Sequence, residues 1–281
     1  MSQVPMFEIL TLTPAMAKEW LENQAPNRNK KPTKIVKFAR DMKHGRWEFT
    51  GETIKFDRNG QMIDGQNRCY AVIEANTPIT AAIVRGLDPA AQSVMDCGSP
   101  RSTRDALTFA GYANAKDLSA TISTHFAWKV GAFSSCVGIM SGTFRLTNAE
   151  MLDYATEHPE LAAYAERAKH LYNQGLKLPC GAIATAVAET TAIDPDASIE
   201  FFDRIVSLKT AGAGDPIYTL LKRVTAMQSG GPGRVYPSTA LFVLFRTWNA
   251  VRAGETLKKF QFGAAATEQH PATWAKIPEP R

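Results

Sequence analysis

The 281-residue sequence predicts an α+β protein, with a mixed N-terminal module at residues 1–105, a mostly α-helical domain at 106–262 and a tail at 263–281. A β-hairpin signal lies between residues 53 and 64. After residue 105 the chain becomes rich in Ala, Leu and Thr, and its apolar residues recur at helical spacing. Hydrophobic residues make up 44% and charged residues 21%, which excludes wholesale disorder and suits two folded domains.

Two helices are expected before the hairpin. Thr13 can cap the first, and Pro14 suits its first turn. Pro32 opens the second, whose apolar residues keep helical spacing until Gly45 stops it. This spacing leaves three lysines on or beside the solvent side of the second helix: Lys34, Lys37 and Lys43.

The hairpin signal consists of two short alternating runs around a turn. Residues 53–57 alternate, Asn59-Gly60 is typical of a type I′ turn, and residues 61–64 return. Gly65 then leads into a short helix, and the β-rich run at 79–87 predicts a central strand. The side chains of the short helix expected to face the core are Cys69, Val72 and Ile73.

Helical patterns occupy most of the remaining chain. Asp88-Pro89 begins a helix that is expected to reach Met95, and another pattern begins near Ala106. The tail from Gly263 onward has three prolines and little periodicity, so we expect it to be loosely held. Further helices are expected at 149–158, 159–171, 183–191, 197–208, 218–227 and 238–253.

Positive charge is concentrated in one short segment. The chain carries a net charge of +5, whereas residues 27–46 alone hold eight basic side chains against one acid, a local net charge of +7. Such a face suits a phosphate-rich partner, namely DNA, RNA or a nucleotide, and a solvated helix face is the alternative interpretation. The residues that we expect to bind DNA are Arg28, Lys30, Lys31, Lys34, Lys37 and Lys43.

Several other classes of protein lack support. The four cysteines form no CxxC pair, and the five histidines show no zinc-hydrolase spacing. The longest apolar runs fall far short of a bilayer span, and residues 1–5 do not resemble a secretory signal. We therefore expect a cytoplasmic protein with reduced thiols and no membrane partner.

The segment from Asp64 to Arg68 carries the clearest chemistry. A strand ends at Gly65 and turns directly into a helix, so the backbone N–H groups at the helix start carry the positive end of its dipole. Such a corner can bind an anion, and Arg68 can add a forked donor to a phosphate. Asp64 could hold a divalent metal or accept a proton. An ordinary strand–turn–helix corner, with Asp64 and Asn67 as capping residues, is the alternative.

The run Asp64-Gly65-Gln66-Asn67-Arg68, followed by Tyr70-Ala71, resembles the Gly-x-x-Arg box of the ParB/sulfiredoxin-like superfamily. More narrowly it resembles the DGQHR-type variants of phage and prophage ParB-like proteins. The preceding basic helix, the hairpin and the arginines near residue 101 fit as well, so the resemblance covers roughly residues 8–105. It implies a sulfiredoxin-like fold, nucleotide binding at the box, and DNA as a partner in a phage or mobile-element setting. If the protein is phage-encoded, its expected location is the host cytoplasm.

The resemblance also implies roles for individual residues. Gly65 and Arg68 would contact phosphate, together with Asn67. Apart from the resemblance, Arg101 and Arg104 form a second candidate phosphate clamp, because arginines near a helix start neutralise charge well; surface arginines in a loop are the alternative. Sulfiredoxin-like proteins have a reactive cysteine after the glycine and ParB-like clamps a glutamate, whereas this chain has Gln66, which cannot act as a thiolate or a general base. Cys69 is expected to be a packing residue.

Three functions stay open at this point. The first is a ParB-like protein that binds DNA, a nucleotide or both. It would carry out metal-assisted nuclease or NTPase chemistry at Asp64 and Gln66. The implied cofactors are a nucleoside triphosphate and Mg²⁺. The second is a DNA-binding protein that has lost turnover, which Gln66 and Asn67 favour. The third is a small-molecule kinase. A homo-oligomer is compatible with each of them.

Overall fold

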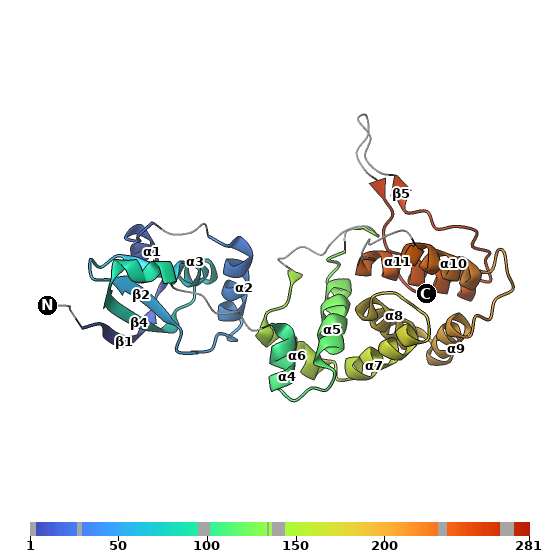
Figure 1. Ribbon diagram of the computed structural model, residues 1–281, viewed down its shortest axis with the longest axis horizontal. Coiled ribbons are helices and arrows are strands. Elements are labelled where there is room, and N and C mark those ends of the chain that lie inside the picture. The colour runs from blue at the N-terminus through green and yellow to red at the C-terminus, as the bar shows by residue number, and fades with distance from the viewer. Residues whose placement is uncertain are drawn as a thin grey trace. The chain divides into compact units, whose positions relative to one another are not determined.

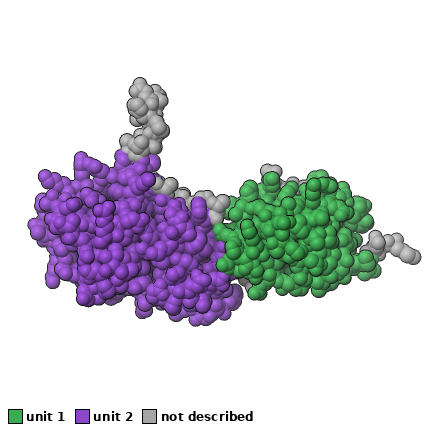
Figure 2. Space-filling view, turned by 180° about the vertical axis from the view of Figure 1, so that it is seen from behind, with its two compact units in different colours: residues 1–101 green, residues 102–281 purple. Residues whose placement is uncertain are grey.

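The computed structural model describes residues 4–26, 30–94, 102–133, 135–136, 144–229, 235–264 and 273–281. These residues form eleven α-helices, one 3-10 helix and six strands, which confirms the predicted α+β fold. The chain divides into two compact units, residues 1–101 and 102–281, coloured separately in Figure 2. None of the helices in the described ranges is long and apolar enough to cross a membrane.

Unit 1 is built on a four-stranded mixed sheet with the strand order β1-β4-β2-β3. β1 pairs antiparallel with β4, β4 pairs parallel with β2, and β2 and β3 form the predicted hairpin. The run at 79–87 is therefore a central strand, as expected. The strands are β1 (Met6–Leu12), β2 (Thr53–Asp57), β3 (Met62–Asp64) and β4 (Ile79–Leu87).

Three helices complete unit 1: α1 (Pro14–Glu22), α2 (Pro32–Lys43) and α3 (Gln66–Ala75). α3 lies between α1 and α2 and packs against both (Figure 1). Trp20 meets Phe56 edge to face at a centroid distance of 5.0 Å, in a core shared by the helices and the sheet. The Thr13 hydroxyl accepts a hydrogen bond from the Met16 amide, which confirms the expected helix cap.

Several details of unit 1 differ from the sequence predictions. β1 was not predicted, and Ile73 is 37% exposed because it lies on the outer side of α3. The hairpin turn is not type I′, because only Gly60 has a positive φ there, +80°. Instead the Gly60 amide donates to the Asp57 carbonyl, which suits a type I turn followed by a left-handed glycine. Residues 89–94 form the 3-10 helix η1 (Pro89–Val94) rather than an α-helix.

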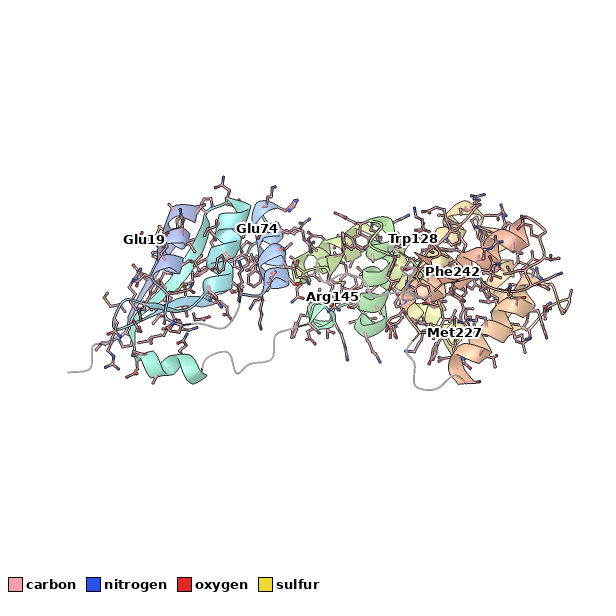
Figure 3. The ribbon with its side chains drawn as sticks, turned by 90° about the horizontal axis from the view of Figure 1, so that it is seen from above. Glu19, Glu74, Trp128, Arg145, Met227 and Phe242 are labelled. Atoms are coloured by element: carbon pink, nitrogen blue, oxygen red, sulfur yellow. The ribbon has the colours of Figure 1, made fainter. Side chains whose placement is uncertain are left out.

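Unit 2 is helical, apart from the short pair β5 (Gly263–Ala264) and β6 (Thr273–Trp274). α8 is its central helix and packs against α5, α7, α9 and α11. Trp128 and Phe242, labelled in Figure 3, belong to the core around it. The helices are α4 (Thr103–Phe109), α5 (Ala115–Lys129), α6 (Asn148–Glu157), α7 (Glu160–Asn173), α8 (Cys180–Ile193), α9 (Pro195–Val206), α10 (Pro216–Ser229) and α11 (Pro237–Arg252).

The C-terminal residues 273–281 are held to unit 2, contrary to the expected loose tail. The Trp248 indole N–H donates to the Arg281 carbonyl at 2.8 Å, and the Cys136 amide donates to the Ala275 carbonyl at 2.8 Å. Ile277 packs against the main core. A side chain and a backbone amide from distant parts of the sequence thus hydrogen-bond to the carbonyls of a segment that has no periodicity of its own.

Candidate nucleic-acid interface

Gly65 forms the corner between β3 and α3. Its φ of +111° lies in the left-handed region, where residues other than glycine are strained. A Cβ at this position would also lie 2.8 Å from two side-chain carbons of Ile54. Close packing of the corner against β2 therefore explains this glycine without a bound phosphate.

Arg68 is engaged with the backbone at the start of β2. Its Nη1 donates to the Glu52 carbonyl at 2.7 Å and its Nη2 donates to the Thr53 carbonyl at 2.6 Å. The same Nη2 lies 3.7 Å from Asp64, and the side chain is only 13% exposed. The expected phosphate donor is thus a link between α3 and β2, two segments of the chain that meet only in the folded state.

Asp64 also has partners within unit 1. Its Oδ2 accepts a hydrogen bond from Lys55 Nζ at 2.7 Å, and its Oδ1 accepts one from the Gly65 amide at 2.8 Å. Across the described ranges, no cluster of three or more His, Cys, Asp or Glu side chains is arranged to hold a metal ion. The catalytic and metal-binding roles of Asp64 stay predictions.

The two polar residues after Gly65 are buried. Gln66 and Asn67 are each 6% exposed. The Asn67 amide oxygen accepts a hydrogen bond from the Lys31 backbone amide at 3.1 Å, which joins the start of α3 to the start of α2. Asn67 thereby holds the N-terminal start of α2 in place.

Cys69 is a packing residue, as expected. Its side chain is fully buried and lies 3.8 Å, sulfur to sulfur, from Met62. Burial raises the pKa of the Cys69 thiol to about 12, although the neighbouring charge of Arg68 acts in the opposite direction. The thiol is therefore protonated at neutral pH and is no nucleophile.

α2 presents a basic solvent side. It buries Ile35, Ala39 and Met42 against the core. At 100° per residue, the basic positions 34, 37, 40 and 43 follow each other in steps of three and spread over about half of the helix circumference, within which the acidic Asp41 is also buried. We call Lys30, Lys31, Lys34, Lys37 and Lys43 the basic face of α2.

Most of the basic face is free to meet a partner. Lys30, Lys31, Lys34 and Lys43 are exposed, and among the described residues no carboxylate pairs with them. Lys37 is half-buried and has other contacts. Lys30 Nζ lies 5.3 Å from the ring centroid of Tyr70, and Lys34 Nζ lies 5.2 Å from that of Phe38, so aromatic rings support two of the ammonium groups.

The start of α2 concentrates this charge further. The first turn contains no acid, and the N-cap residue Lys31 makes no side-chain capping bond. Lysines at the positive end of a helix dipole reduce helix stability, and they leave a strong positive potential that an anion can neutralise. Local stability alone therefore does not explain this arrangement.

The remaining expected site residues lie elsewhere. Arg104 is exposed on α4 and belongs to unit 2. Its neighbours Ser102 and Asp105 form a capping box at the start of α4, which explains the polar character of that segment. Arg28 and Arg101 fall outside the described residues.

A second polar cluster, in unit 2, was not found in the sequence. His125 on α5 lies with Nε2 3.2 Å from Glu189 Oε1 of α8 and with Nδ1 2.8 Å from the Tyr154 hydroxyl of α6. Burial and then the charge of Glu189 raise the pKa of Tyr154 to about 12. Because Glu189 is ionised, His125 donates to it through Nε2, while Nδ1 and the Tyr154 hydroxyl share the other hydrogen bond. Tyr154 and Glu189 lie 29 and 64 positions from His125 in the sequence, so no local spacing identifies the cluster.

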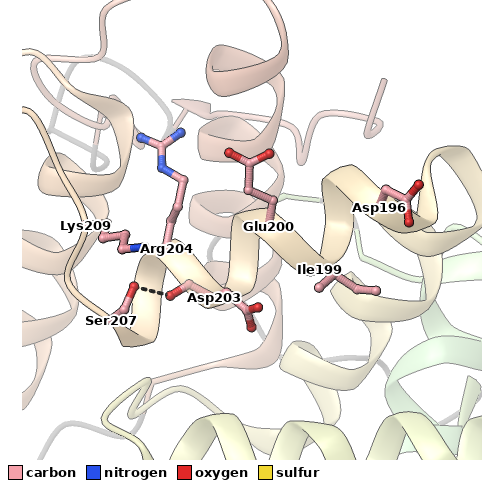
Figure 4. Close-up of a pocket in the computed structure, with 7 residues that line it drawn as sticks. All are labelled: Asp196, Ile199, Glu200, Asp203, Arg204, Ser207 and Lys209. Carbon is pink, nitrogen blue, oxygen red and sulfur yellow. Dashed lines mark hydrogen bonds between the residues drawn. The ribbon is translucent and has the colours of Figure 1, made fainter.

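A shallow hollow lies along α9, between Asp196 and Lys209 (Figure 4). Its side chains include both acids and bases, and the Ser207 hydroxyl donates to the Asp203 carbonyl of the same helix. The Arg204 guanidinium lies 3.3 Å from Asp215. None of the residues expected to bind a ligand lines this hollow.

Comparison with protein-family models, with curated proteins and with solved structures finds no match. The ParB/sulfiredoxin-like resemblance stays a prediction that depends on the residues quoted for it.

Proposed function

We propose that this protein binds DNA through the sugar–phosphate backbone, with the basic face of α2 as the contact surface, and that the corner at Gly65 supports this surface without turnover. The observation that carries the proposal is the set of four exposed lysines, Lys30, Lys31, Lys34 and Lys43, without carboxylate partners among the described residues. Contacts to phosphate supply affinity without reading sequence, so no base preference is implied.

The dimensions of α2 suit a nucleic-acid backbone. Its twelve residues extend about 18 Å, which matches about five base pairs along a duplex. The basic positions turn around the helix at every third residue and follow an inclined ridge rather than a straight line. A helix lying across a groove can thus reach phosphates on its two sides.

The corner favours a binding protein over a nucleotide-processing enzyme. Arg68 uses its guanidinium on the Glu52 and Thr53 carbonyls, and Asp64 is paired with Lys55. Nucleotide binding in the manner that the resemblance implies would require Arg68 to leave these acceptors. Melting curves with ATP, CTP or GTP and Mg²⁺ test this alternative, because a ligand of the folded state raises the melting temperature by mass action.

The salt dependence of DNA binding tests the proposal directly. Four neutralised phosphates predict a slope of about −3.6 for log K against log salt, which is a loss of about 150-fold between 50 and 200 mM salt. The double variant Lys34→Gln and Lys43→Gln should flatten the slope by about 1.8. Fluorescence anisotropy with a labelled duplex measures both quantities.

The matched control is Lys258→Gln with Lys259→Gln, which removes the same charge from exposed positions in unit 2. We expect the control to keep the parent slope and nearly the parent affinity. Equal losses in the two double variants would show that net charge alone, and not the basic face of α2, controls binding.

A further inference from the structure

β1 is an edge strand with unusually exposed apolar side chains. Met6 is 67%, Phe7 61% and Ile9 57% exposed. All seven residues of β1 pair with β4 in continuous register, without a bulge. The strand itself contains no lysine and no proline, so it lacks the usual features that prevent one sheet edge from pairing with another.

The opposite edge of the same sheet is covered. β3 has only three residues, and the segment 23–25 runs beside it. The Ala25 amide donates to the Met62 carbonyl at 3.0 Å, and the Met62 amide donates to the Asn23 carbonyl at 3.1 Å. The fold therefore protects one edge, while the described residues leave β1 without a neighbour on its outer side.

We propose that β1 pairs antiparallel with β1 of a second copy of this chain, which joins the two four-stranded sheets into one. A second copy suits the charge of this edge. Glu8 is the only charged residue of β1, and it is paired with Arg85 of its own chain at 2.8 Å. A partner strand therefore needs no positive charge to compensate Glu8, and β1 of a second copy, which has the same apolar composition, can pair along this edge.

The sequence of β1 selects one register. Pairing centred on Ile9 overlaps the whole strand, from Met6 opposite Leu12 onward, and places Glu8 opposite Leu10. Pairing centred on Glu8 would place two carboxylates opposite each other, which is unfavourable. Pairing centred on Phe7 would bring Pro5, which has no N–H donor, opposite Ile9. The two-fold axis of the dimer therefore passes beside Ile9.

The dimer is expected to be weak. The exposed apolar side chains of β1 and Val4 supply roughly 400 Å² per copy, at roughly 100 Å² for each half-exposed large side chain. A standard interface takes about 800 Å² per partner. Association should therefore be reversible and depend on the protein concentration rather than being permanent.

Sedimentation of the full chain over a concentration series tests the dimer. The average mass should rise from that of one chain, 30.8 kDa, toward twice that value. Ile9→Lys should weaken dimerisation at least about tenfold, and Ile9→Thr, which retains strand propensity, should weaken it in the same direction. The control Ile199→Lys changes an isoleucine of similar exposure on α9 and should leave the dissociation constant of the dimer unchanged. Circular dichroism confirms folding of each variant.

Cross-linking tests the register. Directly opposite residues have Cα atoms about 4.5–5.5 Å apart, within disulfide range. Ile9→Cys should form a disulfide-linked dimer with diamide, which takes up the two protons and two electrons of the thiols. Phe7→Cys should not form this disulfide, because two residues at position 7 would be about 14 Å apart in this register. The parent, which has no cysteine in β1, should not form it either. Three results would overturn the proposal. The chain could stay monomeric at every concentration, both Ile9 variants could keep the parent dissociation constant of the dimer, or positions 7 and 9 could cross-link equally.

Discussion

Glu189 provides a quantitative test of the polar cluster in unit 2. Its side chain is 14% exposed, and Oε1 lies 2.8 Å from Lys129 Nζ and 3.2 Å from His125 Nε2. Burial acts to raise the pKa of Glu189, but the hydrogen bonds from His125 and Lys129 outweigh it and lower the pKa from 4.5 to about 2. A pKa change of this size corresponds to about 3 kcal/mol of folding free energy.

The sign of the pH dependence follows from the lowered pKa. Below pH 4.5 the unfolded chain binds a proton at this carboxylate, whereas the folded chain excludes it until the pH approaches 2. The contribution of Glu189 is therefore fully present above pH 4.5 and is lost as the pH falls to about 2. Glu189→Gln should cost about 3 kcal/mol at pH 7 and almost nothing near pH 2.

Urea unfolding at a series of pH values measures this difference. The control Glu166→Gln removes an exposed carboxylate from α7 with the same change of charge, and it should unfold like the parent at every pH. At neutral pH the Glu189 variant should melt about 6–12 °C lower. A loss that is the same at pH 7 and pH 2.5 would refute the electrostatic argument and indicate a packing effect.

Two further substitutions test close contacts. Gly181→Ala should destabilise unit 2 by about 1–3 kcal/mol, because the new Cβ would lie 2.5 Å from the Ala120 carbonyl oxygen of α5. A thermal melt measures the loss, and a variant as stable as the parent would contradict this prediction. Arg68→Met should cost about 2–4 kcal/mol, since two backbone carbonyls lose charged donors. DNA affinity measured well below the melting temperature should fall only in part, because Arg68 supports the basic helix without itself binding phosphate. A stable Arg68→Met variant with no DNA affinity would instead identify Arg68 as a phosphate ligand.

Local patterns predicted most elements of the fold. Helix caps such as Thr13, helix-opening prolines such as Pro32 and the spacing of apolar residues identify helices within a few residues of their ends. β1 escaped prediction because its Phe7 and Ile9 are exposed, so its apolar residues do not mark a buried face. The C-terminal residues escaped it because their hydrogen bonds go to distant groups such as Trp248.

The candidate site was only partly predictable. The sequence identified the basic stretch and the corner at Gly65, because charge density and a glycine between a strand and a helix are local properties. It did not reveal that Ile54 leaves no room for a Cβ at Gly65 or that Arg68 reaches carbonyls 15 and 16 residues earlier. These contacts arise from the pairing of β2 with its neighbours, which residue spacing does not encode.

The corner and the basic helix form one structural assembly in unit 1. Arg68 fixes the start of α3 to β2, and Asn67 fixes the same turn of α3 to the Lys31 amide at the start of α2. The lysines at that end therefore project from a backbone held by two polar contacts. Preorganisation of this kind lowers the entropy that an incoming polyanion must remove from its binding surface. A box that resembles a phosphate-binding corner would thus serve the proposed DNA binding indirectly, by holding the helix whose lysines we propose contact the phosphates.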